Sequence, residues 1–213
     1  MANEKAVMIS IQPKWCAKIA SGEKTIEVRK TKPKLETPFK VYIYCTKSRT
    51  PYESFGVNKK PIECGGKVIG EFVCDFIPWY ISELWDDETF ERIQEVLEPD
   101  DFAEYGEYEY HTIADNGDDF WEDNMLCKAA CLSVEELRKY IGAGFQKFYG
   151  WHISDLKIYD EPKALSDFRR PCVNDLYCES CGMYSENSGT CGNAALQLKR
   201  APQSWCYVEE VSP

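Results

Sequence analysis

The segment from Met8 to Lys30 constrains the fold of this 213-residue chain more than any other part of the sequence. It reads M-I-S-I-Q-P-K-W-C-A-K-I-A-S-G-E-K-T-I-E-V-R-K. Pro13 suits the first turn of a helix, and Gly22 suits the left-handed position after a helix end. The pattern therefore predicts a short helix, a glycine stop and a strand in one compact unit.

The predicted strand carries charges where a fold normally places apolar side chains. Because side chains alternate along a strand, its two faces differ in chemistry. One face receives Ile26 and Val28, and the other receives Thr25, Glu27 and Arg29. Lys24 stands directly before this strand, so it can join the charged face.

The net charge of −11 is distributed unevenly along the chain. Between Pro78 and Met125, 17 Asp and Glu stand against the single Arg92, whereas the rest holds 24 Lys and Arg against 19 acids. A basic body can meet a phosphate backbone even when the whole chain is acidic. We expect residues 78–130 to form an acidic helical insertion, with an amphipathic helix over Ile81–Leu97.

The sequence favours a reducing, non-membrane setting. No apolar run approaches the roughly 20 residues that span a bilayer, and the first residues, M-A-N-E-K, lack the apolar stretch of a secretion signal. We therefore expect a cytoplasmic protein that has no membrane partner.

Eleven cysteines in such a chain predict reduced thiols rather than a disulfide framework. Four of them share the polar, turn-rich stretch 170–195, and these are Cys172, Cys178, Cys181 and Cys191. Four thiolates can close a tetrahedral structural zinc site, so we predict zinc there. Free thiols in an ordered loop are the main alternative, and a redox C-x-x-C is the third.

The remaining patterns predict a mostly β fold with short helices, of the α+β class. Strands are expected at Lys40–Cys45, Val68–Phe76 and Gln203–Glu209, where apolar residues alternate. Ser133 and Glu136 form a capping box that begins a short helix. Because no strand–helix–strand repeat appears, the pattern favours a partly open antiparallel β-barrel.

Three segments resemble the ASCH family of the PUA-like superfamily. Two are the expected strand segments Gly65–Cys74 and Arg200–Glu210. The third matches the family signature G-x-K-x-x-E-x-R through Gly22, Lys24, Glu27 and Arg29. The resemblance implies a single PUA-like domain over residues 1–213, with the barrel expected above.

The same resemblance implies candidate catalytic chemistry. Some members are amidohydrolases that deacetylate N4-acetylcytidine with a lysine, a threonine and a glutamate. By motif position, Lys24 and Glu71 match the lysine and the glutamate. Glu27 occupies the threonine position, and a carboxylate cannot replace a hydroxyl nucleophile without a change of mechanism. Thr25 could serve only in a shifted pocket, so a hydrolase, either amidohydrolase or ribonuclease, is one functional alternative.

Binding is the first hypothesis, because other members of the family are RNA-binding modules. A cleft lined by Lys24, Glu27, Arg29 and Glu71 is expected to take RNA or a modified nucleotide, with Glu71 buried against a cation. A structural ion pair is the simpler interpretation of these charges.

Other side chains could add base stacking and phosphate contacts. The candidates are Trp15, Trp151, His152, Arg169 and Arg170, with Trp79 also near the end of a predicted element. Burial in the core is the simpler interpretation of each tryptophan, and Trp151 is the best exception, because Gly150 and His152 on either side of it indicate a turn. A third functional hypothesis is a protein partner, or nucleic-acid mimicry, through the acidic insertion.

Overall fold

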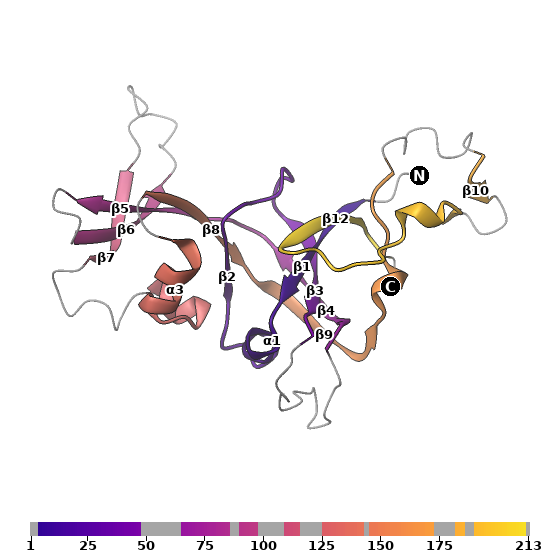
Figure 1. Cartoon of the computed structure of the whole chain (residues 1–213), viewed down its shortest axis with the longest axis horizontal. Coiled ribbons are helices and arrows are strands. Elements are labelled where there is room, and N and C mark those ends of the chain that lie inside the picture. The colour runs from indigo at the N-terminus through magenta and orange to yellow at the C-terminus, as the bar shows by residue number, and fades with distance from the viewer. Residues whose placement is uncertain are drawn as a thin grey trace. The chain divides into compact units, whose positions relative to one another are not determined.

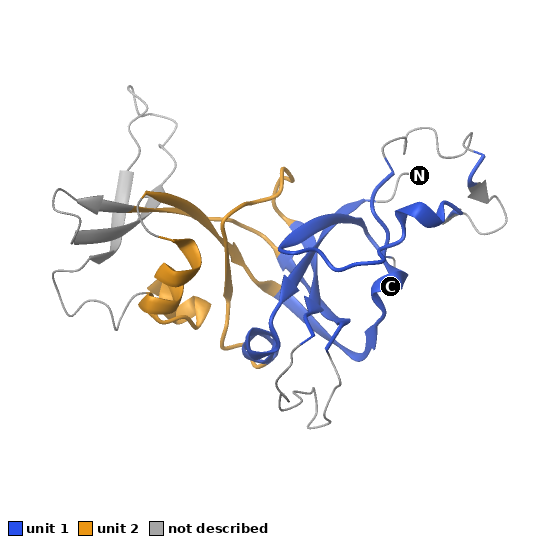
Figure 2. Cartoon of the chain, viewed as in Figure 1, with its two compact units in different colours: residues 1–20, 39–73, 155–213 blue, residues 21–38, 74–154 orange. Residues whose placement is uncertain are grey.

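The computed structural model describes residues 4–47, 65–85, 90–97, 109–115, 125–142, 145–172, 182–185 and 190–211. The chain divides into two compact units (Figure 2). Unit 1 comprises residues 1–20, 39–73 and 155–213, and unit 2 comprises residues 21–38 and 74–154. Each unit is built on one five-stranded sheet.

The sheet of unit 1 has the strand order β12-β1-β3-β4-β9 (Figure 1). Its strands are β1 (Lys5–Ile11), β3 (Phe39–Cys45), β4 (Lys67–Cys74), β9 (Ser154–Lys163) and β12 (Trp205–Glu209). β1 pairs antiparallel with β12 and parallel with β3. A parallel pair needs a crossover, and here helix α1 (Pro13–Ala20) lies on the connection. A two-stranded ladder of β10 (Tyr184–Ser185) and β11 (Thr190–Cys191) also belongs to unit 1.

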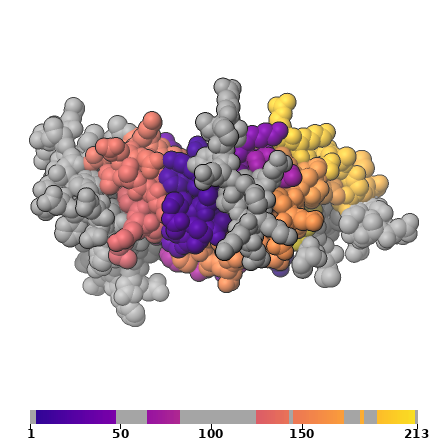
Figure 3. All heavy atoms as spheres, turned by 90° about the horizontal axis from the view of Figure 1, so that it is seen from below, coloured from indigo at the N-terminus to yellow at the C-terminus, as the bar shows by residue number. Residues whose placement is uncertain are grey.

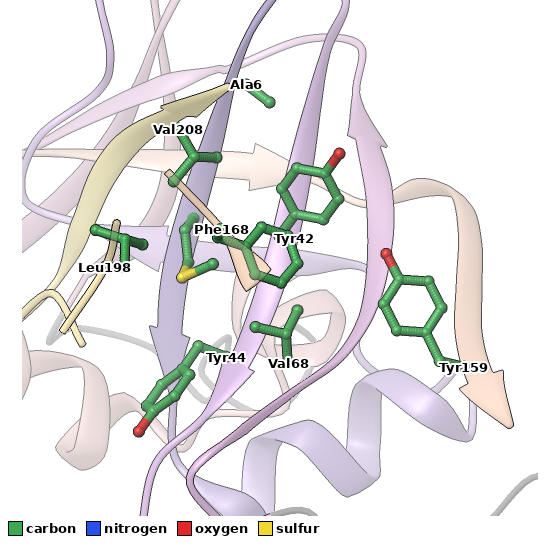
Figure 4. Packing of buried hydrophobic residues seen from close by; sticks show 9 residues of the cluster. Ala6, Tyr42, Tyr44, Val68, Tyr159, Phe168, Leu198 and Val208 are labelled. Atoms are coloured by element: carbon green, nitrogen blue, oxygen red, sulfur yellow. The ribbon is translucent and has the colours of Figure 1, made fainter. Parts of the chain in front are cut away.

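One buried cluster of unit 1 packs on one face of this sheet (Figure 4), and Val7, Ile9, Val41 and Ile43 are buried on the other face. Tyr42 meets Phe168 edge to face, with ring centroids 4.8 Å apart, a favoured geometry for aromatic pairs. Phe168 follows the 3₁₀ turn η3 (Leu165–Asp167), and a second turn, η5 (Ala194–Leu196), comes shortly before Leu198. The buried set is Ala6, Met8, Tyr42, Tyr44, Val68, Tyr159, Phe168, Leu198 and Val208.

The sheet of unit 2 has the order β2-β8-β5-β6-β7. Its strands are β2 (Ile26–Arg29), β5 (Trp79–Trp85), β6 (Phe90–Leu97), β7 (Glu109–Asp115) and β8 (Gln146–His152). Helices α2 (Met125–Ala130) and α3 (Val134–Ile141) pack on it through a core that includes Val28, Tyr80, Leu137 and Phe148. Helix α2 contacts β2, and residues 125–142 form the salmon surface in Figure 3.

Several sequence predictions are confirmed. The described part of the chain is mostly β with short helices, and both sheets are open, with edge strands rather than closed rings. Helix α1 begins at Pro13, and Gly22 has a left-handed φ of 77°. The capping box also forms, since Ser133 Oγ accepts from the Glu136 amide and the Glu136 carboxylate accepts from the Ser133 amide. None of the described helices is long and apolar enough to span a membrane.

The helix predicted over Ile81–Leu97 is wrong. The segment contains β5 and β6, which pair antiparallel, and β5 also pairs with β8. Aromatic and β-branched residues such as Trp79, Tyr80 and Ile81 fit a pleated, half-buried surface. Pairing on both sides of β5 therefore outweighs the weak helical spacing of apolar residues in this segment.

Candidate functional site

Three charged residues of unit 2 form a compact, buried ion cluster. Lys24, Glu27 and Arg29 are only 3%, 7% and 8% exposed. The Glu27 carboxylate pairs with both cations, at 3.2 Å from Lys24 Nζ and 2.9 Å from an Arg29 terminal nitrogen. Glu27 thus bridges the two cations in a desolvated position. We call these three residues the charge cluster.

Backbone contacts hold the charge cluster against α2. Lys24 Nζ donates to the carbonyl oxygen of Ala130 at 2.6 Å, where the helix ends. Unsatisfied carbonyls at a helix C-terminus favour a cation. The Thr25 amide donates to Ala129, and the Thr25 carbonyl accepts from the Ile153 amide. Thr25 itself is exposed, unlike its charged neighbours.

The charge cluster extends to the molecular surface through α3. Tyr140 lies at that surface, 39% exposed, and its hydroxyl bonds to the Arg29 side chain. Burial raises the pKa of the Tyr140 hydroxyl, against the opposing effect of the Arg29 charge. The exposed Lys30 ammonium lies 5.7 Å from the Tyr140 ring centroid. Tyr140 and Lys30 therefore provide an exposed edge to an otherwise buried site.

Glu71 has a different environment from the one expected. It is half-buried on β4 in unit 1, and its carboxylate accepts a hydrogen bond from the Tyr159 hydroxyl on β9. Burial raises the pKa of Tyr159 above its usual range, and the Glu71 contact adds to this shift. Lys24 and Arg29, the expected partners of Glu71, belong to unit 2 and make ion pairs with Glu27.

His152 forms a dyad with an aspartate at the end of β8. Its Nδ1 lies 2.6 Å from the Asp75 carboxylate, and the imidazole stacks on Phe76 with centroids 4.4 Å apart. Burial opposes ionisation of Asp75, but the hydrogen bond and charge of His152, together with hydrogen bonds from the Asp75 backbone and Ser154, outweigh it and lower the pKa of that carboxyl. Phe76 is 48% exposed. The dyad is thus an oriented, partly accessible imidazole beside an aromatic face.

The other tryptophan and arginine candidates differ in accessibility. Trp151 is fully buried within β8, opposite Glu27, so its expected place at a turn is wrong and it presents no face to a base. Trp15 is half-buried on α1, with Lys14 Nζ 3.9 Å from its ring centroid. Arg169 donates to the carbonyls of Cys191 and Asn193, and Arg170 is exposed.

The predicted zinc ligands are described only in part. Cys172 and Cys191 are half-buried free thiols, whereas Cys178 and Cys181 lie outside the described residues. Within the described ranges, no group of three metal-ligating side chains occurs. Arg169 fixes the backbone at Cys191 where the β10–β11 ladder ends. The zinc site therefore stays a prediction.

A second surface of unit 2 joins Trp79, a stacking candidate from the sequence, to residues that the sequence did not single out. Lys147 Nζ lies 3.6 Å from the Trp79 ring centroid and 5.7 Å from that of Tyr149. Lys32 Nζ lies 5.6 Å from the same Tyr149 ring. Trp79 and Tyr149 are half-buried, and both lysines are exposed. The alternation that places Lys147 and Tyr149 on one face of a strand can be read from the sequence. The pairing of Tyr149 with Trp79 across the sheet cannot.

Neither a known protein-family model nor a curated protein matches this chain. Among solved structures, the chain is similar to ASCH proteins. One is the ASCH protein of Zymomonas mobilis, at 18% identity and a TM-score of 0.41, with 95% of this chain and 86% of that chain covered. A point mutant of the same protein gives 18% identity and a TM-score of 0.42, over 96% and 90% of the two chains. At these values the likeness does not by itself establish a common activity.

Proposed function

We propose that this chain binds RNA or a modified nucleotide, and that the charge cluster of unit 2 attracts its phosphate. The observation that carries the proposal is the exposed edge of the charge cluster, where Lys30 stands beside the Tyr140 ring and the Tyr140 hydroxyl bonds to the buried Arg29. Cations beside a low-dielectric surface attract an anion more strongly than they would in bulk water. Exposed Lys30 and Tyr140 supply the accessible edge.

The contacts support binding better than hydrolysis. A general base needs a lone pair within reach of the proton that it removes. The Lys24 ammonium is paired with Glu27 and donates to Ala130. The Glu71 carboxylate accepts from Tyr159. Each member of the expected proton-exchanging pair therefore has another partner.

Salt-dependent binding of a short single-stranded RNA tests this proposal. Fluorescence anisotropy over a salt series should give a linear fall of log K against log salt, with a slope of about 0.7 per phosphate contact. Lys30→Ala should reduce that slope by about one contact. Lys5→Ala, which removes an exposed lysine from unit 1, is the charge-matched control and should leave it unchanged. Absence of binding to both RNA and N4-acetylcytidine would contradict the proposal.

We also propose that Cys172, Cys178, Cys181 and Cys191 hold one structural zinc ion. The donor chemistry supports this, because four thiolates suit tetrahedral zinc and the surrounding stretch has few apolar residues with which to fold. Metal analysis of protein purified without chelator should find about one zinc per chain. Cys181→Ser should lower that content, whereas Cys206→Ser on β12 should not. Metal-free, folded wild-type protein would refute the site.

A further inference from the structure

We propose that the face of the unit 2 sheet carrying Trp79 and Tyr149 is a base-stacking subsite for single-stranded RNA. This inference rests on the proposed function and specifies its ligand: an unpaired strand rather than a duplex or an isolated phosphate. Three features support it, namely the register of the strands, the cations beside each ring, and the link to the charge cluster.

The register places the two rings side by side. Trp79 on β5 is the direct partner of Tyr149 on β8 in an antiparallel ladder. Directly opposed residues project from the same face of a sheet, and neighbouring strands lie about 4.8 Å apart. The two aromatic side chains can therefore take consecutive bases of one extended strand.

The same row of the sheet reaches the charge cluster. Tyr149 is also the direct partner of Arg29 on β2. Arg29, Tyr149 and Trp79 thus form one line across three adjacent strands. A strand that stacks on the aromatic pair has its backbone beside the cationic end of this line. The arrangement combines base stacking with phosphate attraction in one face of one unit.

Cations flank both rings. Lys147 lies over Trp79 and Tyr149, and Lys32 lies over Tyr149 from the turn after β2. In the free protein these cation–π contacts keep the ammonium groups beside the ring faces. A bound base can take the place of an ammonium on the ring face. The displaced ammonium can then pair with the neighbouring phosphate, so the lysine exchanges one favourable contact for another. Aromatic faces interleaved with lysines are typical of single-strand binding surfaces.

A partner protein is a weaker fit to the same chemistry. Lysine is depleted at the centres of protein–protein interfaces, because burying an ammonium costs free energy. Here exposed lysines stand beside each ring instead of at a distant rim. Single-stranded nucleic acid turns these charges into favourable contacts.

The test compares two aromatic variants with a matched tryptophan. Binding of a uridine RNA of about ten nucleotides is measured for the full chain and for Trp79→Leu, Tyr149→Leu and Trp205→Leu. Trp205 is a half-buried tryptophan of unit 1 and serves as the control. Trp79→Leu and Tyr149→Leu should each weaken binding about 5-fold to 100-fold, the range measured for loss of one stacked base. Trp205→Leu should match the wild type.

A second probe separates stacking from charge. Inorganic polyphosphate has no bases, so its binding should be equal in the wild type and in Trp79→Leu. Tyr149→Phe keeps the ring and should retain RNA binding within about 2-fold. This conservative variant is the folding control for Tyr149→Leu at the same position. Wild-type binding that survives both leucine substitutions would overturn the subsite and leave the proposed function intact. If the wild type binds no RNA, the proposed function itself fails, and the face is left for a protein partner.

Discussion

Glu27→Gln is expected to destabilise the protein by about 3–5 kcal/mol, the usual cost of removing one partner from a buried ion pair. The substitution keeps the side-chain shape but removes the carboxylate that pairs with both buried cations, Lys24 and Arg29. Both lie at 9% side-chain exposure or less, so water cannot replace the lost carboxylate. Denaturant unfolding monitored by tryptophan fluorescence measures the change.

Glu36→Gln is the matched control for this experiment. Glu36 is an exposed carboxylate in unit 2, and such surface changes usually stay within about 0.5 kcal/mol of the wild type. A Glu27→Gln variant that unfolds within about 1 kcal/mol of the wild type would show that the charge cluster is solvated rather than buried.

Gly70→Ala is expected to cost about 3 kcal/mol, at the upper end of what overpacking usually costs. A Cβ at Gly70 on β4 would lie 2.5 Å from the Lys157 carbonyl oxygen on β9 and 3.1 Å from the Ile158 Cα. These obstacles are backbone atoms, so they cannot move away as a flexible side chain would. The two neighbouring strands must separate locally instead.

Gly182→Ala serves as the control, because a Cβ there meets nothing within 4 Å. Thermal unfolding of the two variants should differ clearly, with Gly70→Ala melting well below Gly182→Ala. Equal melting temperatures would mean that β4 and β9 are less closely packed at this position. Because Glu71 is the next residue on β4 and bonds to Tyr159 on β9, the Gly70 change should also disturb that hydrogen bond.

The local part of the site could be predicted from the sequence. Pro13, Gly22 and the alternation after Lys24 specify a helix, a left-handed turn and a charged strand face through short-range rules alone. The structure contains each of these elements, and it joins Lys24, Glu27 and Arg29 in one cluster. Local periodicity sufficed because the cluster lies within six residues of one chain segment.

Long-range pairing could not be predicted in the same way. The apolar spacing of Ile81–Leu97 fits a helix and a pair of strands almost equally well, and pairing of β5 with both β6 and β8 decided the outcome. Glu71 was assigned to Lys24 and Arg29 by charge alone, whereas Glu27 was already beside them in the sequence. Tyr159 is a neighbour of Glu71 only because β4 and β9 are adjacent strands of the sheet.

The pairing of Trp79 with Tyr149 was missed for the same physical reason. Trp79 and Tyr149 are separated by 70 positions, and only the register of β5 with β8 brings them together. Trp151 was preferred as a stacking residue because glycine and histidine flank it, a pattern that suggested a turn. In the folded chain these neighbours belong to one strand, where Trp151 is fully buried and Tyr149, two positions earlier on the same face, is half-buried.

Photo-crosslinking tests the central claim most directly, because it reports which residues touch the bound strand. A uridine RNA that contains 5-iodouridine is bound to the full chain, irradiated and mapped by mass spectrometry of the adducts. We expect adducts at Trp79 and Tyr149, and we expect excess unlabelled RNA to remove them. Adducts that fall outside unit 2 while Trp79 and Tyr149 stay unmodified would contradict the account.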